Sequence, residues 1–209
     1  MKIVKRDVFD ALLWARCSPK LAAQLQRYDL DMMTRRGEYA VHEGDLTIAT
    51  DWRPTVDNLL VLGSIYCDGL VHVELEGCSD WDWGGSLWVF GDLHCRHFAS
   101  HDGTSVVVDG NLTVSELAVA AFEDSMLMVA GDFTAHFYYG DDIWANVGGR
   151  AVMEYGNGYA LPFGYDNAEA QSVNPKFDLE TSLARLNLDG EEMAEELVAK
   201  IRLGKHFRD

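Results

Sequence analysis

Leu87-Trp88-Val89-Phe90-Gly91-Asp92-Leu93 is the clearest of six segments of this chain that can be aligned on a glycine. The same spacing recurs around each of the others: Gly44, Gly63, Gly91, Gly110, Gly131 and Gly149. A valine stands two residues before five of the six glycines, and an apolar residue stands two residues after each of them. Self-similarity at a period near twenty residues is typical of a solenoid, in which each repeat buries its apolar face against its neighbours.

The spacing of apolar residues within each repeat predicts strands rather than helices. Apolar side chains recur at every second position on both sides of the glycine, which is the period of a β-strand. The glycine itself is expected at a bend where the backbone needs unusual angles. The sequence therefore predicts a mainly β protein, a single-stranded parallel β-helix of about six coils with helical caps at both ends. An antiparallel sandwich of short strands is the alternative.

The ends of the chain differ from the repeats and predict helices. We expect a helical N-terminal cap over residues 1–37, the solenoid over 38–165 and a C-terminal segment over 166–209. Asp7 is expected to cap a first helix, and Ser18-Pro19 reads as an N-cap followed by proline at the first helical position of a second. A third helix is expected from the helical spacing of Met193, Leu197, Val198 and Ile201.

The bulk composition suits one folded protein of 209 residues in a reducing compartment. The N-terminus has charges but no apolar segment typical of a secretory signal, and no stretch is long and apolar enough for a membrane span. Four cysteines without paired spacing favour the cytoplasm. Cys67 and Cys95 share an inward position of the repeat, so we expect them to be core residues.

The negative charge is concentrated in the repeats. Residues 37–149 hold nineteen Asp and Glu but only two basic residues, Arg53 and Arg96, and this accounts for the whole formal net charge of −17. A surface of one sign speeds the encounter with a cationic partner. It disfavours nucleic acid, whose phosphates need Lys and Arg. An acidic surface that only aids solubility is the alternative.

A row of apolar residues on the outward side of the repeats needs a cover. It lies three positions before the glycines and consists of Leu60, Trp88, Val107 and Met128. The C-terminal amphipathic helix is the expected cover. A second copy of the chain, as in a homodimer, or another protein is the alternative.

The longest interval between glycines, from Gly63 to Gly91, predicts a loop that protrudes from one coil. Its carboxylates and tryptophans suit a basic protein or a sugar, unless the rings fold back over the solenoid. The candidate partner-binding residues in this loop are Glu76, Asp80, Trp81, Asp82 and Trp83. A similar mixture two turns later adds Tyr138, Asp141, Asp142 and Trp144.

Motifs for catalysis, cofactors and metals are not found. The chain has no phosphate-binding loop, no GxSxG elbow, no HExxH and no CxxC pair. His94, Cys95, His97 and His101 are close in sequence, but neighbours on a strand face opposite ways. We therefore expect no enzyme activity, no cofactor and no metal site.

The recurring Val-x-Gly-[Asp/Asn]-[Leu/Phe] unit is similar to the repeat of bactofilin-like, polymer-forming cytoskeletal proteins over about residues 40–155. That resemblance implies a right-handed, non-enzymatic β-helix and a self-assembling scaffold. A second resemblance is one of type only: small, acidic proteins without catalytic residues look like bacterial toxin-immunity proteins, whose targets are often basic nucleases.

Three functions follow from these features. The first is a binding protein that holds a basic partner, with toxin neutralisation as the favoured case. The second is a scaffold that self-assembles through the outward apolar row. The third, least favoured, is a glycan-binding or glycan-cleaving β-helix.

Overall fold

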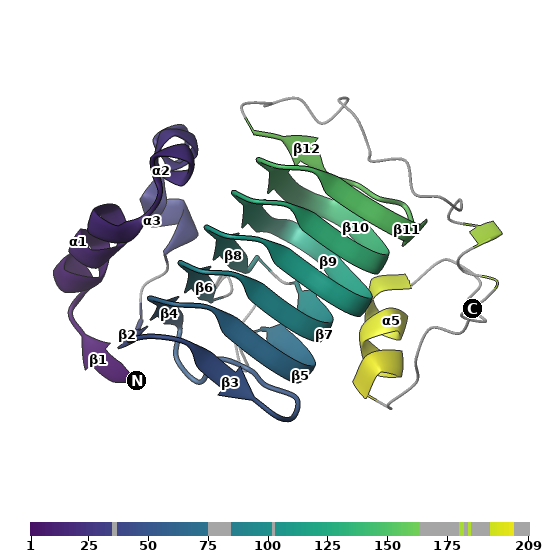
Figure 1. Ribbon diagram of the computed structural model, residues 1–209, viewed down its shortest axis with the longest axis horizontal. Coiled ribbons are helices and arrows are strands. Elements are labelled where there is room, and N and C mark those ends of the chain that lie inside the picture. Colours follow the sequence, from purple (N-terminus) through teal and green to yellow (C-terminus); the bar gives the residue numbers. More distant parts are fainter. Residues whose placement is uncertain are drawn as a thin grey trace.

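The computed structural model is a parallel β-solenoid of about five turns with a few flanking helices (Figure 1). Strands make up 51% of it and helices 18%. The structure describes residues 1–34, 37–74, 85–101, 103–163, 180–181, 184 and 193–202. The predicted β-helix is confirmed, with about five turns instead of six.

Within the part of the chain that the structure describes, twelve strands and four helices are defined, with the labels of Figure 1. The helices are α1 (Arg6–Arg16), α2 (Pro19–Leu25), α3 (Leu30–Met33) and α5 (Met193–Arg202). The strands are β1 (Lys2–Val4), β2 (Tyr39–His42), β3 (Leu46–Ile48), β4 (Asn58–Val61), β5 (Ile65–Val73), β6 (Ser86–Val89), β7 (Leu93–Ser100), β8 (Ser105–Val108), β9 (Leu112–Val129), β10 (Phe133–Val147), β11 (Ala151–Gly156) and β12 (Leu161–Pro162).

Each full turn presents three faces. The first face holds the residues just after the repeat glycine, where β3, β5, β7, β9, β10 and β11 begin and pair in parallel. The second face holds the later parts of β5, β7, β9 and β10. The third face holds β2, β4, β6, β8, the ends of β9 and β10, and β12.

The valines two residues before the glycines stack in register along the third face. Val61 pairs with Val89, Val89 with Val108, Val108 with Val129, and Val129 with Val147. All five are buried in one core cluster that fills the solenoid. This vertical alignment of equivalent side chains was the basis of the fold prediction, and it is confirmed.

The repeat glycines are required by stacking rather than by backbone angle. The amide of Gly110 donates to the carbonyl of Gly91 at 3.0 Å, and the amide of Gly131 donates to that of Gly110 at 2.8 Å. A Cβ on Gly110 would lie 2.6 Å from the Gly91 carbonyl oxygen. Of the six, only Gly44 has a positive φ, of 80°. The expectation of unusual angles is therefore wrong for the other five glycines.

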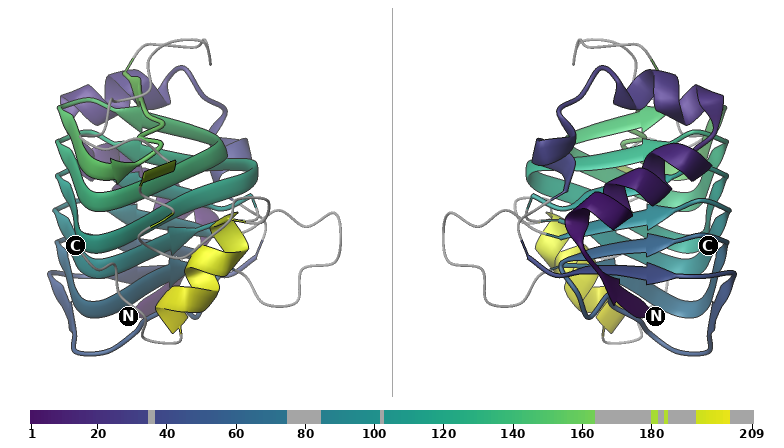
Figure 2. Two further views of the ribbon diagram at one scale, coloured as in Figure 1. Left: turned by 90° about the vertical axis from the view of Figure 1, so that its right-hand side faces the viewer. Right: turned by 90° about the vertical axis from the view of Figure 1, so that its left-hand side faces the viewer.

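The N-terminal helices cover the third face. Figure 2 shows α1 lying across its strands, with α2 beside the last turns. Phe9, Leu13, Leu21 and Leu25 of these helices are fully buried. They form one cluster with the outward apolar row of Leu60, Trp88, Val107 and Met128, which is also fully buried. The expectation that the C-terminal helix covers this row is wrong, because the chain's N-terminal helices already occupy it.

The C-terminal helix packs on a different face. The expected helix forms as α5, and its Leu197 and Val198 are buried against the second face. Their partners there are outward residues of the later strand segments: Leu70, Ala99, Leu117, Val119, Ala121, Phe137, Tyr139 and Tyr155. The solenoid thus has two apolar outer faces, each with its own amphipathic cover, and none of the described helices covers the first face.

Helices α1 and α2 differ in how their N-termini are capped. Ser18 caps α2 as predicted, since its hydroxyl accepts from the Leu21 amide at 3.2 Å and Pro19 follows it. The predicted cap by Asp7 is wrong: α1 starts after Lys5, whose side chain makes no capping bond, and Asp7 lies in the first turn. There its charge still favours the positive end of the helix dipole.

Strand β1 was not predicted. It pairs antiparallel with β2 and thereby covers the outer edge of the first strand of the third face. An uncovered edge strand offers its amides and carbonyls to other chains. At this face, the 3 residues of β1 serve as an edge cover.

Candidate functional site

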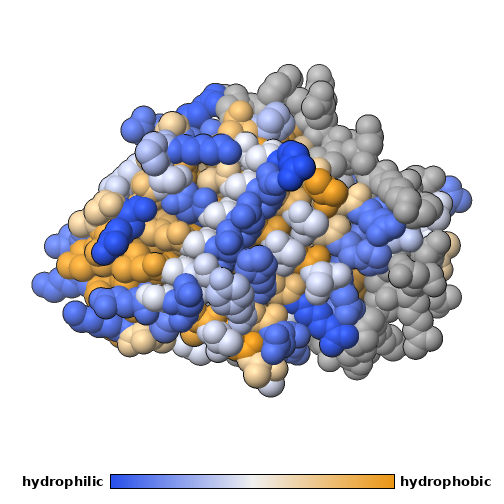
Figure 3. All heavy atoms as spheres, viewed as in Figure 1, coloured by the Kyte–Doolittle hydropathy of each residue, from blue (hydrophilic) through white to orange (hydrophobic). Residues whose placement is uncertain are grey.

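The negative charge lies on the outside of the solenoid. Every acidic residue of 37–149 whose side chain the structure describes is at least partly exposed. Figure 3 shows mainly hydrophilic residues over the strands of the solenoid, whereas hydrophobic residues gather where α1 lies. Of the exposed large apolar side chains, Val8 and Trp14 belong to α1, with 43% and 40% exposure.

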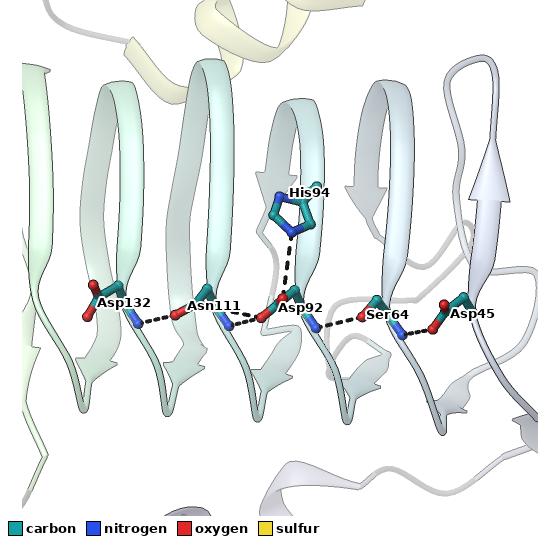
Figure 4. A network of polar contacts seen from close by, with 6 residues as sticks. All are labelled: Asp45, Ser64, Asp92, His94, Asn111 and Asp132. Atoms are coloured by element: carbon teal, nitrogen blue, oxygen red, sulfur yellow. Dashed lines mark hydrogen bonds and ion pairs between the residues drawn. The ribbon is translucent and has the colours of Figure 1, made fainter.

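Five residues that directly follow the repeat glycines form a polar ladder along one corner (Figure 4). Each side-chain oxygen accepts a hydrogen bond from the backbone amide of the next turn. Asp45 accepts from the Ser64 amide at 2.8 Å, Ser64 from Asp92 at 3.0 Å, Asp92 from Asn111 at 2.7 Å, and Asn111 from Asp132 at 2.8 Å. The sequence showed Asp and Asn here but not the bonds that select them.

Charged and neutral residues alternate along this corner ladder. Asp45, Asp92 and Asp132 are separated by Ser64 and Asn111, so successive carboxylates stand two turns, or roughly 10 Å, apart. Carboxylates on adjacent strands would repel one another. The alternation therefore allows a row of negative charge along a parallel sheet at low cost.

The ladder ends on a cation. The Arg150 amide donates to Asp132 Oδ1 at 2.8 Å, and its guanidinium donates to Oδ2 at 2.8 Å. These hydrogen bonds, from the backbone first and then from the side chain, hold the pKa of Asp132 below its usual value. On the first face, Arg96 is likewise engaged with Glu116, with Nε 2.6 Å from Oε1. The positive charges nearest the carboxylates are thus already paired within the chain.

The predicted partner-binding residues fall into three groups. Glu76, Asp80, Trp81, Asp82 and Trp83 lie outside the described residues. Asp141, Asp142 and Trp144 are exposed and lie close together in β10, where an irregularity in the pairing with β9 separates Asp141 from Ile143. Asp142 has a φ of 47°, which turns the strand at this corner.

Tyr138 was wrongly predicted to bind a partner. It is fully buried in the core, its ring lies edge-on to Phe133, and its hydroxyl donates to the Tyr159 carbonyl at 2.9 Å. Burial raises the pKa of its hydroxyl well above the usual value. The neighbouring Tyr139 faces the other way and its hydroxyl donates to Asp141 at 3.3 Å. Burial, followed by the Asp141 charge, raises the pKa of Tyr139 to about 12.

The two cysteines expected in the core are there. Cys67 and Cys95 are free thiols, both buried, and stand opposite one another on adjacent turns. Burial raises the pKa of the Cys95 thiol well above its usual value, and Cys67 adds to the shift. A protonated, buried thiol is a poor nucleophile and a poor metal ligand.

The histidines do not group as their sequence spacing suggests. His94 stacks on Tyr66 on the first face and lies 3.8 Å from Asp92. His97 lies 3.7 Å from Glu116. His101 instead meets His72, with their Nε2 atoms 2.8 Å apart. Glu74 completes a group of three potential metal ligands. The sequence did not indicate this group, because its members come from two turns of the solenoid and are brought together only by stacking.

No described helix is long and apolar enough to cross a lipid bilayer. Comparisons with protein-family models, with curated proteins and with solved structures find no match for this chain.

Proposed function

We propose that this protein is a non-enzymatic binding protein that uses its acidic solenoid to hold a basic partner protein. The favoured case is the neutralisation of a bacterial toxin, as by an immunity protein in the cytoplasm. The observation that carries the proposal is the position of the charge: the excess of 17 negative charges belongs to residues 37–149, and every acidic side chain that the structure describes in that stretch is at least partly exposed.

Rigidity supports this function. The exposed carboxylates project from strands whose other sides are packed in one continuous core. A preorganised surface loses little conformational freedom when it binds. The corner ladder also repeats its carboxylates at a regular interval of roughly 10 Å. This spacing suits a partner whose basic groups recur every second turn of a helix, since seven residues of α-helix span about 10.5 Å.

The exposed corner of β10 supplies an aromatic contact beside the charges. Trp144 is 37% exposed and follows Asp141 and Asp142 closely. Tryptophan is enriched among the residues that dominate binding energy. Asp141, Asp142 and Trp144 are therefore the described residues that we assign to the partner contact, together with the corner ladder.

The scaffold alternative receives less support. Self-association was expected through Leu60, Trp88, Val107 and Met128, and this row is buried beneath α1 and α2. Addition of a further copy at the β2 edge would have to displace β1.

Binding as a function of salt tests the proposal. The probe is the purified product of a neighbouring gene with a basic sequence, with hen lysozyme as a basic protein of unrelated shape. We expect the neighbour's product to bind at least tenfold more tightly than lysozyme. We also expect its affinity to fall steeply between 50 and 500 mM NaCl, because exposed charges are screened. An affinity that ignores salt would contradict electrostatic docking.

A matched pair of charge variants separates a specific surface from general acidity. The first variant combines Asp45→Asn, Asp92→Asn and Asp132→Asn. Asparagine keeps the acceptor oxygen of the ladder, as Asn111 shows. The second removes the same charge elsewhere, by Asp7→Asn, Asp29→Asn and Glu180→Gln. The ladder variant should lose at least tenfold in affinity and the other less than threefold. Equal losses would leave no role for the ladder.

A further inference from the structure

We propose that His72, Glu74 and His101 form a binding site for a divalent transition-metal ion, with Zn²⁺ as the best match. This site is independent of the proposed partner-binding function. It lies at the edge of the second face, where β5 and β7 end.

The solenoid brings the three residues together from two turns. His72 pairs with Ala99 in the register of β5 and β7. Its neighbours Val71 and Val73 point into the core, so His72 faces outward. Glu74 follows His72 by two residues on one turn, and His101 follows Ala99 by two residues on the next. The period of two and the stacking of turns therefore place all three on one side.

The ligand atoms are close enough to share one ion. One ligand atom from each of the three residues lies within 4.8 Å of the other two. The Nε2 atoms of His72 and His101 are 2.8 Å apart, with ring centroids 5.0 Å apart. Two imidazole nitrogens on a tetrahedral zinc ion stand about 3.3 Å apart, given Zn–N distances near 2.0–2.1 Å. A separation of the rings by about half an ångström would admit the ion.

The protonation states also suit metal binding. His72 Nδ1 lies 3.3 Å from Glu74 Oε2, so it can carry a proton directed at the carboxylate. The lone pair of His72 is then on Nε2, facing His101. Two nitrogens at this distance can share only one proton, which His101 must supply. When a metal ion replaces that proton, His101 carries its proton on Nδ1, and both Nε2 lone pairs face the ion.

The donor set selects the class of metal. Two imidazoles with one carboxylate favour Zn²⁺ and other first-row transition metals, whereas Mg²⁺ and Ca²⁺ prefer oxygen ligands. The His72 side chain is 7% exposed and the Glu74 side chain 23%, so the ligands are partly held in place by packing. In the structure the Glu74 carboxylate faces His72 Nδ1, and it has to turn from there to the ion to become the third ligand. Three protein ligands then leave a fourth position for water.

Metal titration of the full chain after chelator treatment tests the site. With ZnCl₂ as probe, calorimetry should show one ion per chain with a dissociation constant of micromolar or tighter. CoCl₂ should produce the visible absorption of a tetrahedral ion. MgCl₂ should produce no binding. Millimolar zinc binding, one ion shared by two chains, or equal binding of Mg²⁺ would overturn the proposal.

Variants locate the site. His101→Gln, at a partly exposed position, should weaken zinc binding at least tenfold, and His72→Gln should do the same. Zinc should raise the melting temperature of the wild type but not of His101→Gln. His136→Gln is the matched control, because His136 is also paired with a carboxylate, Glu154, at 3.2 Å, but does not belong to the group of three potential metal ligands. Loss of binding in His136→Gln and not in His101→Gln would overturn the assignment.

Discussion

Asp109 of the solenoid clamps the start of helix α2, because its carboxylate accepts hydrogen bonds from both the amide and the hydroxyl of Ser18. The hydrogen bond from the Ser18 amide to Asp109 Oδ2 measures 2.6 Å. The two residues are 91 positions apart in the chain. Ser18 is also the N-cap of α2. The Asp109 carboxylate therefore orients the capping residue and links helix α2 to the third face. It also lies near the positive end of the helix dipole, where a negative charge is favourable.

Asp109→Ala should therefore destabilise the protein. The loss of a charged acceptor for two donors at a helix start corresponds to about 1–2 kcal/mol of unfolding free energy. Urea unfolding followed by circular dichroism measures the change. Asp68→Ala removes an exposed carboxylate elsewhere on the solenoid and should change stability by less than about 0.5 kcal/mol. Equal effects would show that the clamp adds nothing.

Detachment of α1 should expose the outward apolar row to solvent and thereby promote self-association of the protein. Leu13 is fully buried against this row, and Leu13→Asp would place a charge there that only undocking of the helix relieves. Sedimentation velocity should then show association that grows with protein concentration. Trp14→Asp alters the next residue, which is 40% exposed, and should sediment as the wild type does. A Leu13→Asp protein that behaves like the wild type would refute the role of α1 as a cover.

A repeat glycine that stacks on the glycine of the previous turn, such as Gly110, should tolerate substitution far less than Gly44, the first of the six. In Gly110→Ala the new Cβ would meet the Gly91 carbonyl at 2.6 Å, and turns would have to separate, at a cost of roughly 3 kcal/mol. In Gly44→Ala no atom lies within 4 Å of the new Cβ, and only the positive φ is unfavourable, at about 1 kcal/mol. Thermal or urea unfolding of the pair gives the comparison. The reverse order would contradict stacking as the reason for the repeat.

The alternation of charge in the corner ladder predicts a salt-dependent defect in Asn111→Asp. Three consecutive turns would then carry carboxylates, and Asn111 would no longer donate its side-chain amide to Asp92, a bond of 3.1 Å. We expect about 1 kcal/mol of destabilisation at low salt, partly recovered in 1 M NaCl. Asn111→Ser keeps an acceptor without the charge, as Ser64 does, and should lack the salt dependence. A salt-independent defect would point to packing instead.

The lowered pKa of Asp132 predicts a contribution to stability that is lost in acid. A carboxyl whose pKa is lower in the folded than in the unfolded state stabilises the fold above its unfolded pKa of about 4. That contribution disappears as the pH falls through the lower, folded value. Urea unfolding from pH 7 to pH 2 should therefore show a steeper acid loss in the wild type than in Asp132→Asn. Parallel curves would mean that Arg150 does not stabilise the folded carboxylate.

Most of the solenoid could be predicted because its cause is local and repeated. Val89, Val108 and Val129 share one offset from a glycine, and stacking of equivalent residues is the arrangement that buries all of them at once. The helix that begins after Ser18 was likewise predictable from its N-cap residue and the proline that follows, and the helix that contains Leu197 from the helical spacing of its apolar residues. Their partners were not, since an apolar stripe shows that a helix needs a face and does not show which face it finds.

Where side chains point beyond each corner could not be read from the sequence. In β10, Ala135 points into the core, whereas Phe137, two residues later, packs outside it, so the alternation changes sides at this corner and Tyr138 turns into the core. The pairing with β9 is irregular between the same two residues. A similar irregularity between Cys67 and Leu70 in β5 sets the register with β7 that brings His72 near His101. Shifts of one residue exchange the two sides of a strand.

The parallel strands, the inward valines and the concentration of negative charge in the repeats could thus be inferred from the amino-acid order, because they follow from periodicity and composition. In contrast, the folded chain was needed to show which helix covers which face, which tyrosine is buried and which histidines meet. Those outcomes depend on the length of each corner and on contacts between residues far apart in the chain, and a difference of one residue at a corner is enough to change them.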